Sequence, residues 1–153
     1  MTYVADIHAD IDALRELADA LARFRHAQRE VVERGDHEIE ATRASLEAKA
    51  GRWRSLLARR QADLAACQQA AARDAAGPAP DCSAEARAVH EAQERLDLIR
   101  RWQQRVDEEA GAFRGAAIRF RDLLDLDLPR IENHLRAVIG GLEASRRIRV
   151  AGS

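Results

Sequence analysis

The chain has 153 residues, with 25 Lys and Arg against 26 Asp and Glu, and a formal net charge of −1. Aromatic residues make up 4% and charged residues 33%, a composition typical of long helices and coiled coils that argues against a β-sandwich, a barrel or a disordered chain. The balanced charge lacks the basic excess of most nucleic-acid-binding proteins, so we expect no nucleic-acid partner.

The first twelve residues lack the basic start and apolar run of a secretory signal peptide. No stretch approaches the roughly 18 apolar residues that a membrane span requires. We therefore expect a cytoplasmic protein with no membrane span, and export without a signal peptide is the alternative.

A seven-residue apolar pattern along residues 6–73 predicts the first of two long helical arms. Its best row contains Ile11, Ala18, Val32, Ile39, Leu46, Trp53 and Cys67. The row three residues on is broken by Gln28, Gly35, Thr42, Lys49 and Asp63. Adjacent rows hold Leu17, Phe24 and Val31, then Leu57 and Leu64. The apolar stripe is wider than a two-stranded coil needs, which predicts more than one helical neighbour.

Residues 74–83 form the expected tip, because Gly77, Pro78 and Pro80 end helices. Asp81 or Ser83 can then cap the second arm. The two cysteines, Cys67 and Cys82, are separated by 14 residues. In the simplest interpretation Cys67 is a small core residue and Cys82 an incidental loop thiol. The alternative is a disulfide, which would contribute roughly 3 kcal/mol.

The second arm is expected over residues 84–147, followed by a flexible C-terminus at 148–153. One apolar row contains Val89, Leu96, Ala110, Ala117, Leu124, Ile131 and Val138. After Pro129 the row shifts to Leu128, Leu135 and Leu142. Because proline lacks an amide donor and clashes with the preceding turn, Pro129 is expected to kink or split this arm, with Asp125 or Asp127 as the new cap.

Two arms of equal length around one tip predict a single all-α domain, a long antiparallel two-helix hairpin resembling a coiled coil. Facing residue numbers should then total about 156, which places Trp53 near Trp102 and Phe24 near Ile131. A compact four-helix bundle is the alternative, with breaks at Gly35 and Pro129.

The residues offer little for catalysis, and we expect no enzyme, no cofactor and no metal site. No histidine has the Glu three residues before it that di-iron bundles use. His37 and His90 are each followed by Glu but lack the second histidine of a zinc protease. The glycines lack the spacing of a phosphate loop, and the serines lie in no nucleophile elbow.

The helix start Asp10-Ile-Asp-Ala-Leu14, in a hairpin of this length, resembles the small helical hairpins of type VII secretion and the helical adaptors of secreted polymorphic toxins. The resemblance implies a non-enzymatic protein that dimerises through helical faces and accompanies a toxin. The Trp-x-Gly turn of the family is absent, since Trp53-Arg-Ser55 lies mid-helix. The C-terminal tyrosine-based export signal is absent too, since Tyr3 is the only tyrosine.

We therefore expect a helical protein–protein interaction module, with a secretion- or toxin-associated adaptor as the narrower hypothesis. A self-assembling coiled-coil spacer is the alternative. The partner would be another helical protein or, most simply, a second copy of the chain in a four-helix bundle. The candidate interaction surface comprises Leu17, Phe24, Val31, Leu57, Leu64, Trp53 and Trp102.

Overall fold

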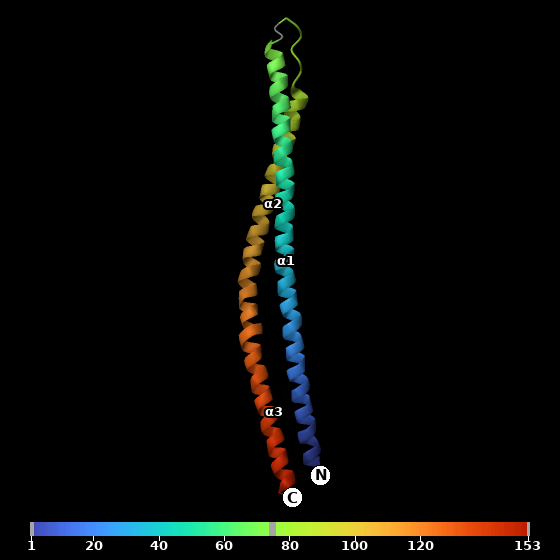
Figure 1. The fold of residues 1–153 in the computed structure, drawn as a ribbon, viewed down its shortest axis with the longest axis vertical. Helices are drawn as coiled ribbons and strands as arrows, with labels where there is room; N and C mark the ends of the chain where they lie inside the picture. The colour runs from blue at the N-terminus through green and yellow to red at the C-terminus, as the bar shows by residue number, and fades with distance from the viewer. Residues whose placement is uncertain (1, 74–75, 153) are drawn as a thin grey trace. The chain divides into compact units, whose positions relative to one another are not determined.

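The computed structural model describes residues 2–73 and 76–152, with side chains in α1 from His8 onward. Its elements are α1 (Thr2–Arg73), α2 (Ser83–Asp122), the π-helical turn η1 (Leu123–Asp127) and α3 (Leu128–Ala151). The first arm, α1, packs antiparallel to a second arm joined from α2, η1 and α3 (Figure 1). The prediction of an all-α helical hairpin is confirmed.

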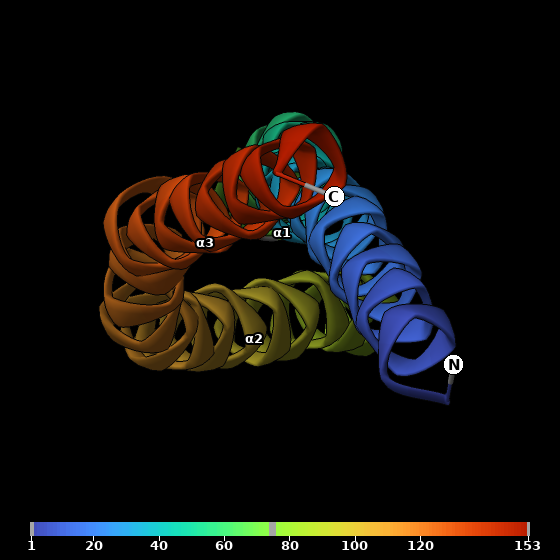
Figure 2. The same cartoon turned by 90° about the horizontal axis from the view of Figure 1, so that it is seen from below.

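Contacts divide the chain into two compact units. The terminal unit comprises residues 1–36 and 113–153, and the tip unit comprises residues 37–112. In the terminal unit, α3 lies beside the N-terminal part of α1, so the two chain ends lie at one end of that unit (Figures 1 and 2).

The four-helix alternative is wrong, because α1 continues through Gly35 without a break and without a positive φ. A glycine inside a helix costs about 1 kcal/mol relative to alanine. Here the missing side chain serves packing, since a Cβ on Gly35 would lie 2.6 Å from Cζ of Phe113. Gly35 therefore allows the two arms to approach closely rather than ending the first one.

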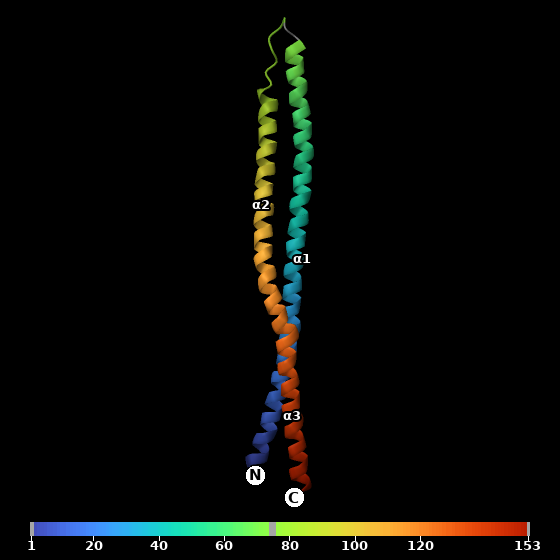
Figure 3. The ribbon, with the colours of Figure 1, turned by 90° about the vertical axis from the view of Figure 1, so that its left-hand side faces the viewer.

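The split of the second arm at Pro129 takes the form of a π turn. The Leu128 amide donates to the carbonyl oxygen of Leu123, five residues earlier. This wider turn precedes Pro129, which has no amide to donate and whose ring would crowd an ordinary α-helical turn. Asp127 precedes α3 but makes no side-chain cap hydrogen bond. Within the terminal unit, α3 follows η1 and lies beside the N-terminal part of α1 (Figure 3).

At the tip, residues 74–75 of the expected segment lie outside the described residues. The carboxylate of Asp81 accepts a hydrogen bond from the amide of Ser83, the first residue of α2, at 3.0 Å. This agrees with the expected role of Asp81 at the start of the helix. At the other end of the second arm, α3 continues to Ala151, four residues beyond the expected end.

The core of the tip unit is a cluster of Ala50, Leu96 and Ile99, with Trp53 and Leu57 packed against it. In the terminal unit, the buried apolar side chains are Ile11, Val32, Ala117, Leu124, Leu128 and Ile139. The interface between the two arms, which we call the seam, also buries Glu132, which is 3% exposed.

The seam changes rows along α1. In the terminal unit the covered positions alternate in steps of three and four, at residues 11, 14, 18, 21, 25, 28, 32 and 35. Two steps of four, from Gly35 to Ile39 and from Ile39 to Arg43, then move it to residues 46, 50, 53, 57, 60, 64 and 67. Such a stutter displaces a heptad seam by one row. It explains why Thr42, Lys49 and Asp63 are polar, since they lie outside the seam.

The register differs between the units. The polar contacts of the terminal unit, from His8–Arg146 to Asp36–Arg121, join residues whose numbers total 154 to 158, whereas Gly35 and Phe113, at the boundary of the unit in the chain, total 148. The expected register of about 156 therefore holds there. In the tip unit, pairs such as Arg43–Asp107 and Arg60–Glu91 total about 150, so the expected register is wrong in that unit.

Candidate interaction surface

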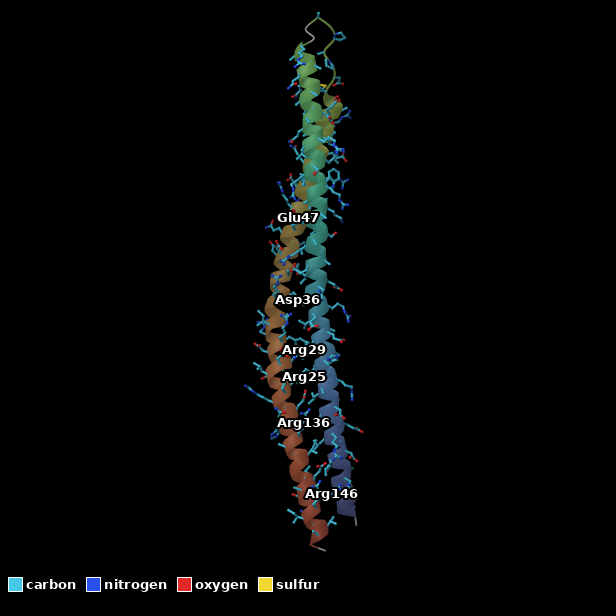
Figure 4. All side chains as sticks on the ribbon, in the orientation of Figure 1. Arg25, Arg29, Asp36, Glu47, Arg136 and Arg146 are labelled. Atoms are coloured by element: carbon cyan, nitrogen blue, oxygen red, sulfur yellow. A yellow bond between two sulfur atoms is a disulfide. The ribbon has the colours of Figure 1, made fainter. Side chains whose placement is uncertain are left out.

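One flank of α1 in the terminal unit carries a row of polar contacts to the second arm. The row contains His8, Arg15, Arg29 and Asp36, which recur at multiples of seven residues. Their partners are Arg146, Glu143, Asp125 and Arg121 in that order. Figure 4 labels Arg29, Asp36 and Arg146. Exposed ion pairs contribute only about 0.2–1 kcal/mol each, so the row mainly shows which side of the hairpin is charged. We call it the polar flank.

The opposite flank of α1 is apolar. Leu17, Phe24 and Val31 lie two residues after positions of the polar row, so they are rotated about 200° around the helix axis. Their exposed fractions are 48%, 46% and 53%. In the terminal unit, these three side chains therefore project from the side opposite the polar flank.

The second arm contributes to the same side. Within α3, Glu143 faces the polar flank through its pair with Arg15. Val138 is five residues before Glu143, a rotation of about 140°, and Ile131 lies seven residues before Val138. Ile131 is 47% exposed and Val138 is 38% exposed. Because buried Ile11 and Ile139 mark the seam between the arms, both apolar rows lie on the side away from the ion pairs.

The register places these rows opposite one another. With facing numbers near 156, Leu17 lies opposite Val138, and Phe24 lies opposite Ile131, as predicted. We define the apolar face as Leu17, Phe24, Val31, Ile131 and Val138. It spans both arms of the terminal unit.

Between Ala13 and Val31 and between Ile131 and Ser145, the rows beside the apolar face carry no formal charge, whereas Arg34 and Asp127 border it at one end. On α1 the adjacent row consists of Ala13, Ala20 and Ala27, all exposed. On α3 the neighbouring exposed positions are His134, Gly141 and Ser145. An uncharged strip bordered by small residues has the chemistry of a helix–helix contact rather than of a solvated surface.

The prediction that Leu57 and Leu64 widen the exposed stripe is wrong. Leu57 packs against the core of the tip unit, and Leu64 is half-buried in the shifted seam. Trp53 also packs against this core, and the Arg60 guanidinium lies over its ring at 5.9 Å. The stutter explains this burial, because it moves the row that contains Leu57 and Leu64 from the flank of α1 into the seam.

Trp53 and Trp102 do not lie opposite one another as expected, because facing residue numbers total about 150 in the tip unit and not 156. Trp53 packs against the cluster that contains Leu96 and Ile99, whereas Trp102 is 51% exposed with Arg105 over its ring at 5.8 Å. Leu98, one turn before Trp102, is 40% exposed. Trp102 thus stays a member of the exposed apolar surface, in the tip unit.

The predicted shift of the apolar row after Pro129 is confirmed, and it matters for the site. The π turn takes up one additional residue, so Glu132 and Ile139 enter the seam while Ile131 and Val138 turn outward. Leu128, Leu135 and Leu142 remain at the seam, as predicted. Pro129 was the only sequence signal for this change of face.

Cys67 and Cys82 form a disulfide, with their Cα atoms 5.9 Å apart. The simpler interpretation of two unrelated thiols is therefore wrong, and the alternative holds. The bond ties the last turns of α1 to the residue preceding α2, within the tip unit.

These features define an all-α helical hairpin with one polar flank and one exposed apolar face. No protein-family model, no curated protein and no solved structure matches the chain. Within the described part of the chain, no helix is both long enough and apolar enough to cross a membrane.

Proposed function

We propose that this protein is a non-catalytic helical protein–protein interaction module, and that the apolar face of the terminal unit is its binding surface. The observation that carries the proposal is the segregation of the two flanks. Inter-arm ion pairs occupy one side, while Leu17, Phe24, Ile131 and Val138 remain about half exposed on the other.

The energetics support a contact at this face. Full burial of a large apolar side chain contributes about 1.5–3 kcal/mol. Each of the five residues has already buried about half of its surface within the hairpin. Covering the remainder would contribute about 1 kcal/mol per residue on the same scale. A contiguous apolar strip of this kind usually marks a surface that another protein covers.

The disulfide supports a narrower proposal, a secretion-associated adaptor. Disulfides persist in oxidising compartments and are rare in the reducing cytosol. A hairpin whose tip is joined by Cys67–Cys82 is therefore better suited to function after export than to a purely cytoplasmic role. Alkylation of free thiols in intact cells, followed by separate recovery of cells and medium, tests this. A reduced protein confined to cells would contradict it.

Site-specific photo-crosslinking tests the binding surface. A photoreactive phenylalanine derivative in place of Phe24 should yield a covalent product with a protein in the source organism. The matched control carries the same derivative at Arg23, an exposed residue rotated about 100° from Phe24 around the helix axis. Equal yields at the two positions, or no product at residue 24, would contradict the proposed function.

A further inference from the structure

We infer that the occupant of the apolar face is a second copy of this chain, related to the first by a two-fold axis. The inference rests on the proposed function and adds the identity of the partner. It would join two terminal units face to face as a four-helix assembly.

The first argument is charge. From Ala13 to Val31, the positions of α1 that face this side are alanine, leucine, phenylalanine or valine. From Ile131 to Ser145, those of α3 are isoleucine, histidine, valine, glycine or serine. A partner with charged groups on its contacting surface would lose their hydration without gaining a counter-charge. The matching surface must itself be uncharged and apolar, and the chain carries such a surface on both arms.

The second argument is shape. Helices in bundles pack with axes about 8–10 Å apart, and small side chains allow the closest approaches. Ala20 and Ala27 flank Phe24 on α1, and Gly141 follows Val138 on α3. Alternation of large and small residues lets the large side chains of one copy enter spaces between those of the other. An isologous contact requires this self-complementarity.

The third argument is area. The strip from Ala13 to Val31 is about 27 Å long at 1.5 Å per residue, and two helices side by side are about 20 Å wide. Two such faces would together bury about 1,000 Å², which is near the lower limit for a specific interface. The dimer should therefore be reversible, with a dissociation constant in the micromolar range.

Analytical ultracentrifugation of the intact, purified chain tests the inference. At about 100 micromolar, well above a micromolar dissociation constant, the wild type should sediment with twice the mass of the 17.0 kDa chain. Leu17→Glu with Phe24→Glu should give a monomer, and so should Ile131→Glu with Val138→Glu on the other arm. Arg23→Glu changes the net charge by the same two units but lies off the face, so it should remain a dimer.

Circular dichroism shows whether each variant stays helical. If a glutamate pair unfolds the chain, Leu17→Ala with Phe24→Ala replaces it, and the dissociation constant should rise about tenfold or more. A monomeric wild type would overturn the second-copy inference. A dimer that survives either double glutamate substitution would overturn the assignment of the face.

The two proposals fail differently. If the wild type is monomeric but the derivative at residue 24 crosslinks to another protein, the interaction module stands and the second copy is wrong. If residue 24 crosslinks to nothing, the proposed function fails as well.

Discussion

Arg25 and Glu132 pair across the seam of the terminal unit, with Nε of Arg25 3.4 Å from Oε1 of Glu132. The Glu132 side chain is 5% exposed and that of Arg25 is 32% exposed. Arg136 lies 4.0 Å from the other carboxylate oxygen. A charged pair thus occupies a position in the seam that an apolar pair would fill in an ideal hairpin. Figure 4 labels both arginines.

Removing one partner of this pair should destabilise the protein. Arg25→Met leaves the buried carboxylate of Glu132 with only the more distant Arg136, and we expect a loss of about 3 kcal/mol. Arg25→Leu with Glu132→Leu removes both charges and should leave stability unchanged or raise it by about 1–4 kcal/mol. Urea denaturation of the single and double variants measures both effects. If Arg25→Met leaves the free energy of unfolding unchanged, the pairing of Arg25 with Glu132 is contradicted.

Gly35→Ala should destabilise the protein although alanine has the higher helix propensity. The new Cβ would lie 2.6 Å from Cζ of Phe113, and such overpacking typically costs about 1–3 kcal/mol. Adding Phe113→Leu should recover part of the loss. Gly115→Ala is the matched control, because nothing lies within 4 Å of its Cβ position. That control should stabilise the helix by about 0.5–1 kcal/mol. In thermal unfolding, the midpoint temperature should therefore fall for Gly35→Ala and rise for Gly115→Ala.

The disulfide predicts a thiol count and a change of stability. Protein purified without reductant and then denatured should contain no free sulfhydryl, because Cys67 and Cys82 are bonded. Cys67→Ser with Cys82→Ser should lower the free energy of unfolding by about 3 kcal/mol. Reduction of the wild type should have the same effect and should leave the serine variant unchanged. Two titratable thiols in the unreduced protein would rule the bond out.

The start of α2 should weaken in acid. Hydrogen bonds from the hydroxyl and the amide of Ser83 lower the pKa of Asp81 below its ordinary value of 3.8. Since the folded state holds the lower pKa, this contribution is complete above the ordinary value and is lost as the pH falls through the folded-state value. The Ser83 amide of the wild type should therefore lose its protection against hydrogen exchange as the pH falls below the ordinary pKa of 3.8. Asp81→Asn should show less dependence on pH over the same range.

The sequence by itself predicted the helices, the tip and the antiparallel pairing of the arms. Breakers at Gly77, Pro78 and Pro80 allow only one tight turn, and heptad spacing commits the rest of the chain to helices that need a partner. These features depend on local backbone preferences and on apolar periodicity. Both can be evaluated from neighbouring residues.

Part of the candidate surface was predicted in the same way. Leu17, Phe24 and Val31 flank a well-kept row, so their exposure follows from spacing alone. The disulfide stayed one of two alternatives, because 14 intervening residues permit the bond without requiring it.

Only the tertiary structure decided which row of α1 faces inward beyond Gly35, and that the shift predicted at Pro129 is made by a π turn. A stutter in α1 and a π turn in the second arm each shift the seam by one row, which buries Leu57 and exposes Ile131 and Val138. The polar residues Thr42, Lys49 and Asp63 interrupt the earlier row of α1, but they do not show which neighbouring row replaces it. The choice depends on how the opposite helix packs, through contacts such as Gly35 with Phe113 and Arg25 with Glu132, between residues about 80 to 110 positions apart in the chain.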